Sequence, residues 1–215
     1  MTDARPPIPA GIRDGVVAVA RNLTAETVRG VAEGLVHGGV RALEITLNEP
    51  EERALDALRA AARHADGSAL EIGAGTVLTM DAAQRAIDAG ATFLVSPHID
   101  PALVEWAAER GIPCFPGAFT PTEVLAAWRA GAAAVKLFPA SVAGPSFVRE
   151  FRGPFPEIRL LPTGGVTAET APDFIRAGAI AVGLGSWLIG RGNPRGITSR
   201  AARVVQAVNE ARNSG

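Results

Sequence analysis

The chain alternates short apolar runs with longer stretches in which apolar side chains recur at helical spacing. Short apolar runs are typical of buried parallel strands, and the periodic stretches are typical of amphipathic helices. The pattern predicts strands at residues 15–20, 40–47, 70–74, 92–95, 112–115, within 132–139, at 158–161 and at 179–184. It predicts helices at 24–37, from 50, at 82–89, from 101, from 120, near 145–151, from 168 and from about 196.

Helix boundaries are marked by capping residues. Five predicted helices end at a glycine that is followed at once by a short apolar strand, at Gly39, Gly90, Gly111, Gly131 and Gly178. Glycine adopts the left-handed cap conformation at little cost, so each joint indicates a helix C-terminus. Two helix N-termini are also indicated by capping residues: Asp100 as the N-cap before Pro101, and the capping box that runs from Thr120 to Glu123.

Repeated strand–helix units predict the fold class. Roughly eight units in this length indicate an α/β fold, a (β/α)₈ TIM barrel at the small end of its size range. We expect one domain over residues 1–215, with an N-terminal leader at 1–14 and a closing C-terminal helix at about 196–215. A doubly wound open sheet is the alternative. It would usually need a glycine-rich turn after the first strand, and Ala20-Arg21-Asn22-Leu23 is not such a turn.

Composition and charge restrict the classes of partner. The net charge of −1 gives no electrostatic reason to expect nucleic acid or an anionic membrane as a partner. The single cysteine, Cys114, excludes an internal disulfide and a cysteine metal cluster, and the three distant histidines form no recognisable metal site. The N-terminus lacks the apolar core of a signal peptide, and no apolar stretch is long enough to span a bilayer. We therefore expect a cytoplasmic protein.

Lys136 is the only lysine among 21 basic Lys and Arg residues, and it lies in an apolar run that is typical of a buried strand. Burial disfavours the charged ammonium, and the uncharged amine is a nucleophile. The alternative is a lysine at a strand end that extends to solvent or pairs with a carboxylate. The stretch alone leaves both interpretations open.

Glu44 is the second unusual residue. In the predicted strand 40–47, Leu43, Ile45 and Leu47 share one face, which leaves Glu44 with Ala42 and Thr46 on the other. In a barrel that second face points inward, where a carboxylate is costly unless a cation or a reaction needs it. A structural ion pair with Lys136 is possible, but buried ion pairs are seldom kept for stability alone. The catalytic interpretation is therefore favoured.

Glycine-rich turns follow the last two predicted strands, at Thr163-Gly164-Gly165 and at Gly183-Leu184-Gly185-Ser186. Barrels often bind phosphate after strands seven and eight, where backbone N–H groups without Cβ bulk can converge on phosphate oxygens. Trp187 either packs in the core or forms a wall of the same pocket.

Taken together, these stretches resemble the class I aldolases of the 2-keto-3-deoxy-6-phosphogluconate and 2-keto-3-deoxy-6-phosphogalactonate family. The matching residues are 39–47, 73–78, 135–140, 162–166 and 183–186, in the family's order. The resemblance implies a (β/α)₈ subunit in a homotrimer, with no metal or organic cofactor and a phosphorylated keto-deoxy sugar acid as substrate. It implies a Schiff-base lysine at Lys136 and an acid/base carboxylate at Glu44. It also implies substrate contacts: Thr76, Arg21 and Pro97 near the pyruvyl end, Gly164, Gly165, Gly185 and Ser186 near the phosphate end, and Phe138.

Two positions bear on which substrate epimer is used. The phosphogluconate aldolases of this family usually carry arginine where this chain has Asn48, and the run from Asn48 to Pro50 is closer to the phosphogalactonate enzymes. Thr46 departs from those enzymes in the opposite sense. We therefore expect cleavage of 2-dehydro-3-deoxy-6-phosphogalactonate to pyruvate and glyceraldehyde 3-phosphate. The gluconate epimer, a phosphosugar epimerase without a covalent step, and a binding barrel without turnover are the alternatives, in that order.

Overall fold

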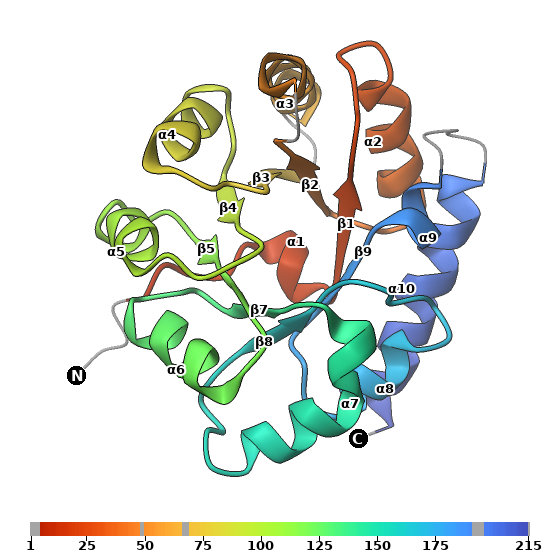
Figure 1. The fold of residues 1–215 in the computed structure, drawn as a ribbon. Helices are drawn as coiled ribbons and strands as arrows, with labels where there is room; N and C mark the ends of the chain where they lie inside the picture. Colours follow the sequence, from red (N-terminus) through yellow and green to blue (C-terminus); the bar gives the residue numbers. More distant parts are fainter. Residues whose placement is uncertain (1–4, 48–49, 66–68, 191–195, 215) are drawn as a thin grey trace.

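The computed structural model describes residues 5–47, 50–65, 69–190 and 196–214. Within them, short parallel strands alternate with helices in the order that the sequence pattern predicts (Figure 1). The strands are β1 (Val16–Ala20), β2 (Ala42–Thr46), β3 (Glu71–Gly75), β4 (Phe93–Val95), β5 (Cys114–Phe115), β6 (Gly117–Ala118), β7 (Val135–Leu137), β8 (Leu160–Pro162) and β9 (Val182–Leu184). The first helices are α1 (Ala10–Arg13), α2 (Val28–His37), α3 (Glu51–Ala65), α4 (Met80–Asp88) and α5 (Pro101–Glu109). The others are α6 (Pro121–Arg129), α7 (Ala140–Arg152), α8 (Ala171–Arg176), α9 (Ser186–Ile189) and α10 (Ile197–Asn213).

The strands form a curled parallel sheet with helices on its outer side (Figure 1). Six strands pair in the order β5-β4-β3-β2-β1-β9, and three pair in the order β6-β7-β8. Only Pro116 separates β5 from β6, and a single parallel bridge joins Thr163 to Gly183, where β8 gives way to its loop. The fold is therefore α/β and resembles a TIM barrel, as expected.

Two apolar clusters lie on the two faces of this sheet. The larger cluster fills the space between strands and helices and includes Leu43, Ile45, Val135 and Leu137. The smaller one lies on the inner face and contains the alternate positions, among them Val17, Ala42, Phe93 and Phe115. In β1 and β2, Val17 and Ala42 of the inner cluster therefore alternate with neighbours in the outer cluster, as a period of two requires. In β7, Val135 and Leu137 belong to the outer cluster and Lys136 lies between them.

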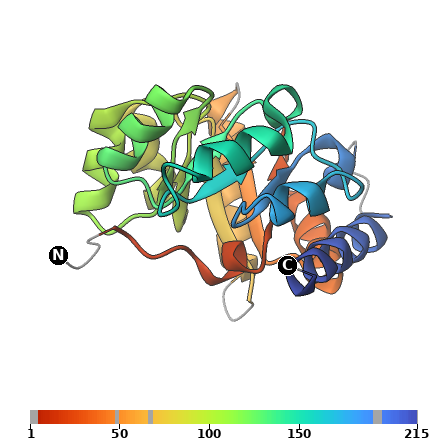
Figure 2. The same ribbon diagram turned by 90° about the horizontal axis from the view of Figure 1, so that it is seen from below.

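Helix α1 lies within the predicted leader at residues 1–14. Its first two backbone N–H groups, on Ala10 and Gly11, donate to the Glu71 carboxylate at 3.2 and 2.7 Å. Its residue Ile12 is buried in the inner cluster, so α1 covers the end of the sheet at which the strands begin. Figure 2 shows the N-terminal segment running along this edge toward α1. The cap comes from a residue 60 positions away, which local sequence patterns cannot reveal.

The predicted capping positions are confirmed. All five joint glycines have positive φ, from 69° at Gly111 to 101° at Gly131. Asp100 accepts from two N–H groups at the start of α5, and Thr120 and Glu123 form the capping box of α6. One boundary differs: α7 begins at Ala140 instead of near 145, because a short first segment precedes the break at Gly144 and Pro145.

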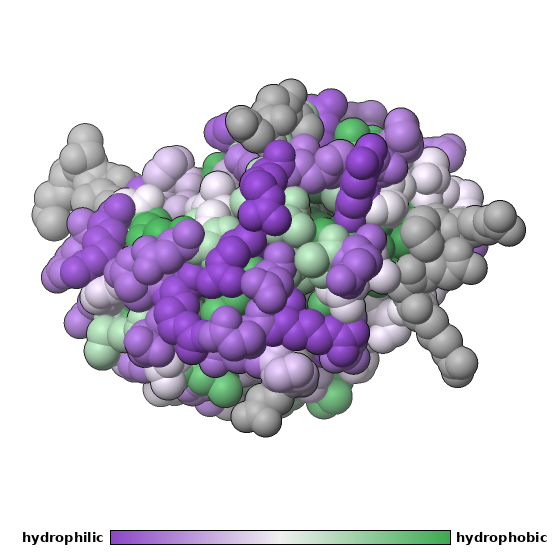
Figure 3. Space-filling model, turned by 90° about the horizontal axis from the view of Figure 1, so that it is seen from above, coloured by the Kyte–Doolittle hydropathy of each residue, from purple (hydrophilic) through white to green (hydrophobic). Residues whose placement is uncertain are grey.

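The outer surface is covered by the polar faces of the helices. Figure 3, which views the edge that carries α3 in Figure 1, shows mostly hydrophilic side chains with small hydrophobic areas between them. None of the helices in the described ranges is both long and apolar enough to cross a bilayer.

Candidate active site

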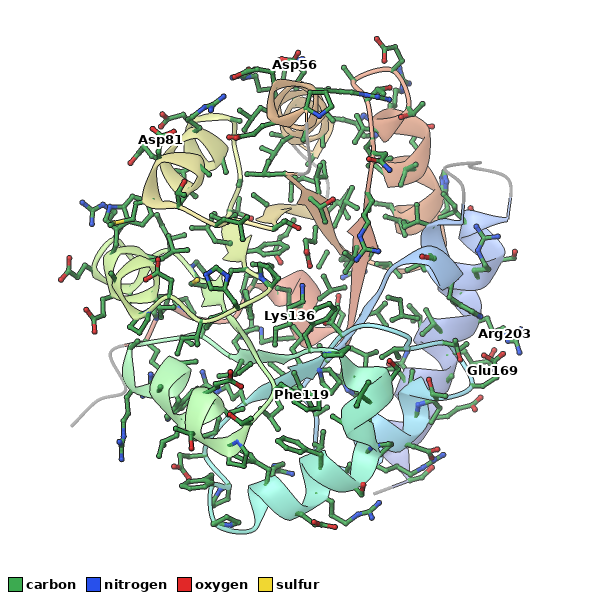
Figure 4. The ribbon with its side chains drawn as sticks, viewed as in Figure 1. Asp56, Asp81, Phe119, Lys136, Glu169 and Arg203 are labelled. Carbon is green, nitrogen blue, oxygen red and sulfur yellow. The ribbon has the colours of Figure 1, made fainter. Side chains whose placement is uncertain are left out.

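The side chains of Lys136 and Glu44 meet inside the sheet. Lys136 Nζ lies 3.6 Å from Glu44 Oε1, and the two side chains are only 8% and 3% exposed. Lys136 Nζ also lies 5.4 Å from the centre of the Phe138 ring. Figure 4 shows Lys136 near the middle of the ring of strands, whereas Asp56, Asp81, Glu169 and Arg203 lie on the periphery. The predicted meeting of these two residues is confirmed.

Strand pairing brings Glu44 to this position. In the parallel registers, Glu44 pairs with Val19 of β1 and with Gly73 of β3, while Lys136 pairs with Gly117 and Leu161. Both charged side chains point inward because their strand neighbours pack outward against the helices. The pair is thus held by two strands that lie far apart in the sequence.

Glu44 Oε1 is buried and has no hydrogen-bond partner among the described residues. Its separation of 3.6 Å from Lys136 Nζ is an ion-pair distance that exceeds normal hydrogen-bond length. A buried carboxylate oxygen without a partner costs free energy, and such exceptions in native structures often mark functional groups. The oxygen is therefore available to accept a hydrogen bond from a bound molecule.

A cavity of about 180 Å³ surrounds the pair. Every residue predicted from the sequence to contribute to the site lines it: Lys136, Glu44, Arg21, Thr76, Pro97, Phe138, Gly164, Gly165, Gly185 and Ser186. Asn48, which bears on the choice of substrate epimer, lies outside the described residues. His98 follows β4 but is absent from the described lining of this cavity.

Loop glycines form one end of the cavity. Gly164 and Gly165 have φ of 97° and 78°, and a Cβ on Gly165 would lie 2.6 Å from the Ser141 Cβ. The N–H groups of Gly164, Gly165 and Gly185 donate to no backbone carbonyl in the described ranges. Several unpaired N–H groups at one end of a cavity can bind an anion.

Thr76 lies at the end of β3 beside the pair. It has φ of 58°, a left-handed conformation that is strained for a β-branched residue. Strained backbone of this kind is concentrated at ligand-binding and catalytic sites, although the angle alone does not assign a role. Pro97 is held close to the sheet because Gly117 has no side chain: a Cβ there would lie 2.4 Å from the Pro97 carbonyl.

The cavity is also lined by residues that were not given a substrate contact. They are Val19, Thr46, Thr163, Val166, Thr167 and Trp187, of which Thr46, Thr163 and Trp187 lie at strand ends or turns that the sequence indicates for the site. Trp187, for which the sequence allows either core packing or a pocket wall, lines the cavity. The alternation that identifies Glu44 also identifies Thr46, whose hydroxyl donates to the Ala20 carbonyl at 3.2 Å. Thr163 begins the glycine-rich turn that the sequence indicates after β8. Val19 carries no chemical signal in the sequence, because only strand pairing places it here.

Other features of the described residues offer no comparable site. No group of three or more His, Cys, Asp or Glu side chains in the described ranges could hold a metal ion. A larger concave region of about 860 Å³ lies at the opposite end of the sheet, beside α1 and α10. Of the arginines that line it, Arg176 pairs with Asp173 and Arg212 donates to two backbone carbonyls.

Comparison with known proteins agrees with this geometry. Residues 12–198 match the family model "KDPG and KHG aldolase". The chain is 38% identical to a probable 2-dehydro-3-deoxy-6-phosphogalactonate aldolase of Rhizobium meliloti, over 91% of this chain and 92% of that protein. It is 36% identical to a 2-dehydro-3-deoxy-phosphogluconate aldolase of Pseudomonas aeruginosa, over 84% and 80% of the two chains.

Solved structures give the same result. The structure described as native KDPGal superposes with a TM-score of 0.85 at 31% identity, over 92% of this chain and 96% of that one. A KDPG aldolase of Legionella pneumophila, with pyruvate captured as a covalent carbinolamine, superposes with a TM-score of 0.78 at 25% identity, over 98% of each chain. The chain therefore belongs to the KDPG and KHG aldolase family, whose members are carbon–carbon lyases.

Proposed function

We propose that this protein is a class I aldolase that cleaves 2-dehydro-3-deoxy-6-phosphogalactonate to pyruvate and D-glyceraldehyde 3-phosphate. The observation that carries the proposal is the buried pair of Lys136 and Glu44, with an amine and a carboxylate 3.6 Å apart in one cavity. Lys136 is also the only lysine of the chain, so an amine nucleophile can come from this side chain or from the N-terminus alone.

In this mechanism Lys136 Nζ, in its uncharged form, attacks the C2 ketone of the substrate. The resulting carbinolamine loses water to give an iminium, and Nζ then carries the carbon–nitrogen double bond. When the C3–C4 bond breaks, its electron pair moves into the iminium and forms an enamine, so the covalent step supplies an electron sink. Protonation of the enamine at C3 and hydrolysis of the iminium release pyruvate and regenerate the amine.

Glu44 is the group that moves protons in this mechanism. Its Oε1 accepts the proton of the C4 hydroxyl as the bond breaks, and the protonated carboxyl returns a proton at C3. Oε1 is buried and lacks a hydrogen-bond partner among the described residues, which leaves it able to accept from a substrate hydroxyl. General acid–base catalysis of this kind contributes a rate factor of about 10²–10⁴.

The glycine end of the cavity binds the substrate's phosphate in this proposal. The N–H groups of Gly164, Gly165 and Gly185, which donate to no backbone carbonyl in the described parts of the chain, supply donors, and Ser186 adds a hydroxyl. Binding energy from this remote group positions C4 against Glu44. Thr76, Pro97 and Phe138 lie around the pair, where the pyruvyl part of the substrate would be.

The choice of the galactonate epimer rests on sequence similarity. The greater identity is to the relative named as a probable phosphogalactonate aldolase, but the phosphogluconate aldolase follows by only two percentage points. The run Leu47-Asn48-Glu49-Pro50 favours the same choice. Initial rates on both epimers, measured side by side, test it: a higher kcat/KM for the gluconate epimer would reverse the assignment.

The remaining features of the proposal concern the whole chain. We infer one domain over residues 1–215, with the two groups of strands joined into a (β/α)₈ barrel through Pro116 and the Thr163–Gly183 bridge. As the family resemblance implies, the protein works as a homotrimer and needs no metal or organic cofactor. Sedimentation at several protein concentrations and turnover after treatment with a chelator test these two points.

Trapping of the pyruvate adduct tests the mechanism. Borohydride should reduce the iminium formed with pyruvate, and mass spectrometry should locate the adduct on Lys136. Lys136→Arg keeps the charge but lacks the nucleophilic amine, so we expect no adduct and a loss of turnover of at least about 10³-fold. Near-normal turnover of Lys136→Arg, or turnover by the wild type without any adduct, would favour the epimerase alternative or another non-covalent mechanism.

A further inference from the structure

A second concave region, the side cavity, opens beside the active-site cavity. It has a volume of about 500 Å³ and lies between the loop after β1, the first turn of α3, and α9. Its lining comprises Val19, Arg21, Asn22, Leu23, Thr24, Thr27, Arg53, Gly185, Ser186, Ile189 and Gly190. Four of these residues, Val19, Arg21, Gly185 and Ser186, line the active-site cavity as well. The side cavity therefore adjoins the glycine end of the active site.

Two guanidinium groups give the side cavity a positive charge. Arg21 and Arg53 line it, and none of its described lining residues is Asp or Glu. Neither arginine has an ion pair with a carboxylate in the described parts of the chain. By contrast, Arg59 on the same helix pairs with Asp56 at 2.8 Å.

Glu26 is an acidic residue near this region, on the loop after β1. The pKa of Glu26 is lowered chiefly by a hydrogen bond from the Thr24 side chain, and the charge of Arg53 is the smallest contribution. Glu26 is fully exposed, so solvent screens that attraction. Arg53 thus keeps its charge and its N–H donors for a bound anion.

We propose that Arg53, together with Arg21, forms a second wall of the phosphate subsite and makes this site selective for phosphorylated substrates. The inference rests on the proposed aldolase function and adds a residue to it. A phosphate monoester carries nearly two negative charges, whereas the backbone N–H groups of the glycine turns supply only partial positive charge. Guanidinium groups supply full charge, and they bind phosphate through two parallel hydrogen bonds.

The position of the side cavity indicates that it binds the substrate's terminal phosphate and not the carboxylate of its pyruvyl part. It shares Gly185 and Ser186 with the active site but shares neither Thr76 nor Pro97, which lie around the proposed pyruvyl part. A group that binds between the glycine turns and Arg53 is thus the terminal group of the substrate. Arg21, which lines both cavities, lies where it can reach that group too.

Arg53→Gln tests the inference, with Arg59→Gln as the matched control on the same helix. The substrates are the phosphorylated keto-deoxy sugar acid and its unphosphorylated analogue with the same carbon skeleton. For Arg53→Gln we expect kcat/KM for the phosphorylated substrate to fall roughly tenfold, because phosphate binding both holds the substrate and positions C4. Values for the unphosphorylated analogue, and all values for Arg59→Gln, should match the wild type. The effect should shrink at high salt, because ions screen the exposed guanidinium.

Borohydride trapping with pyruvate separates failure of this inference from failure of the proposed function. If the wild type forms the Lys136 adduct but Arg53→Gln has an unchanged kcat/KM for the phosphorylated substrate, the inference about Arg53 is wrong and the aldolase assignment stands. A weakened pyruvate adduct in Arg53→Gln would also overturn it, because Arg53 would then act on the carboxylate. A wild type that forms no adduct overturns the proposed function, and the inference with it.

Discussion

The carboxylate of Glu44 occupies the space that a side chain at residue 75 would need. A Cβ built on Gly75 would lie 2.0 Å from Glu44 Oε1 and 2.6 Å from its Cδ. Real Cβ atoms do not approach other atoms so closely, so the carboxylate can keep its position toward Lys136 only if residue 75 is glycine. Gly75 is therefore a positioning residue for Glu44, because the absence of a Cβ at residue 75 leaves room for the Glu44 carboxylate.

Gly75→Ala should displace the Glu44 carboxylate from Lys136. We expect kcat to fall by about 10²-fold, close to the loss of a general acid–base group, with a smaller change in KM. The pH profile of kcat should change with it, because the displaced carboxylate would have a different environment. Overpacking should also cost about 1–3 kcal/mol of stability, which denaturant unfolding measures.

Gly111→Ala is the control for Gly75→Ala. Gly111 has φ of 69°, so alanine is strained there, but a Cβ at this position meets no atom within 4 Å. This variant should lose stability and keep its kcat and pH profile. If Gly75→Ala also keeps the wild-type kcat and pH profile, then the working position of the Glu44 carboxylate does not depend on the absence of a side chain at residue 75.

Glu44→Gln should separate proton transfer from covalent adduct formation. The amide keeps the size of the side chain but cannot accept a proton, so we expect kcat to fall by about 10²–10⁴-fold. Borohydride trapping of pyruvate on Lys136 should be affected less. Exchange of the pyruvate C3 protons with deuterated solvent, followed by NMR, is the direct measurement. Exchange at the wild-type rate would show that another group moves these protons.

The fold and the reactive pair could be predicted because both follow from local patterns. Period-two alternation in residues 40–47 places Glu44 on the face opposite Leu43 and Ile45, and the structure has it there. The joint glycines indicate helix ends in the same way, through a backbone conformation that other residues rarely adopt.

Features that depend on contacts distant in sequence could not be predicted. Gly75 affects Glu44 only because β2 and β3 pair in one particular register. Helix α1 is four residues long and depends on Glu71 for its N-terminal hydrogen bonds. The relation of Arg53 to the active site depends on how α3 approaches the loop after β1, and that approach leaves no pattern in the sequence.

Cys114 offers a pH-dependent test of burial in the sheet. Burial in β5 raises the pKa of its thiol from 9.0 to about 12. Between these pH values the unfolded chain releases the thiol proton and the native chain keeps it, so the unfolded state binds fewer protons. Stability is therefore fully present below about pH 9 and falls as pH rises toward 12, with a slope from this group of up to about 1.4 kcal/mol per pH unit.

The composition makes this contribution measurable. The chain has no tyrosine and only one lysine, so few other side chains titrate in the same pH range. Cys114→Ala removes the thiol and nearly conserves its size, although it alters packing by an amount that does not depend on pH. The difference in free energy of unfolding between the wild type and Cys114→Ala should therefore shift in favour of the variant as pH rises from 9 to 11. If the free energies of unfolding of the wild type and Cys114→Ala instead change in parallel over that range, the folded protein accommodates the thiolate. The native state would then open around β5 far more readily than the burial of this strand implies.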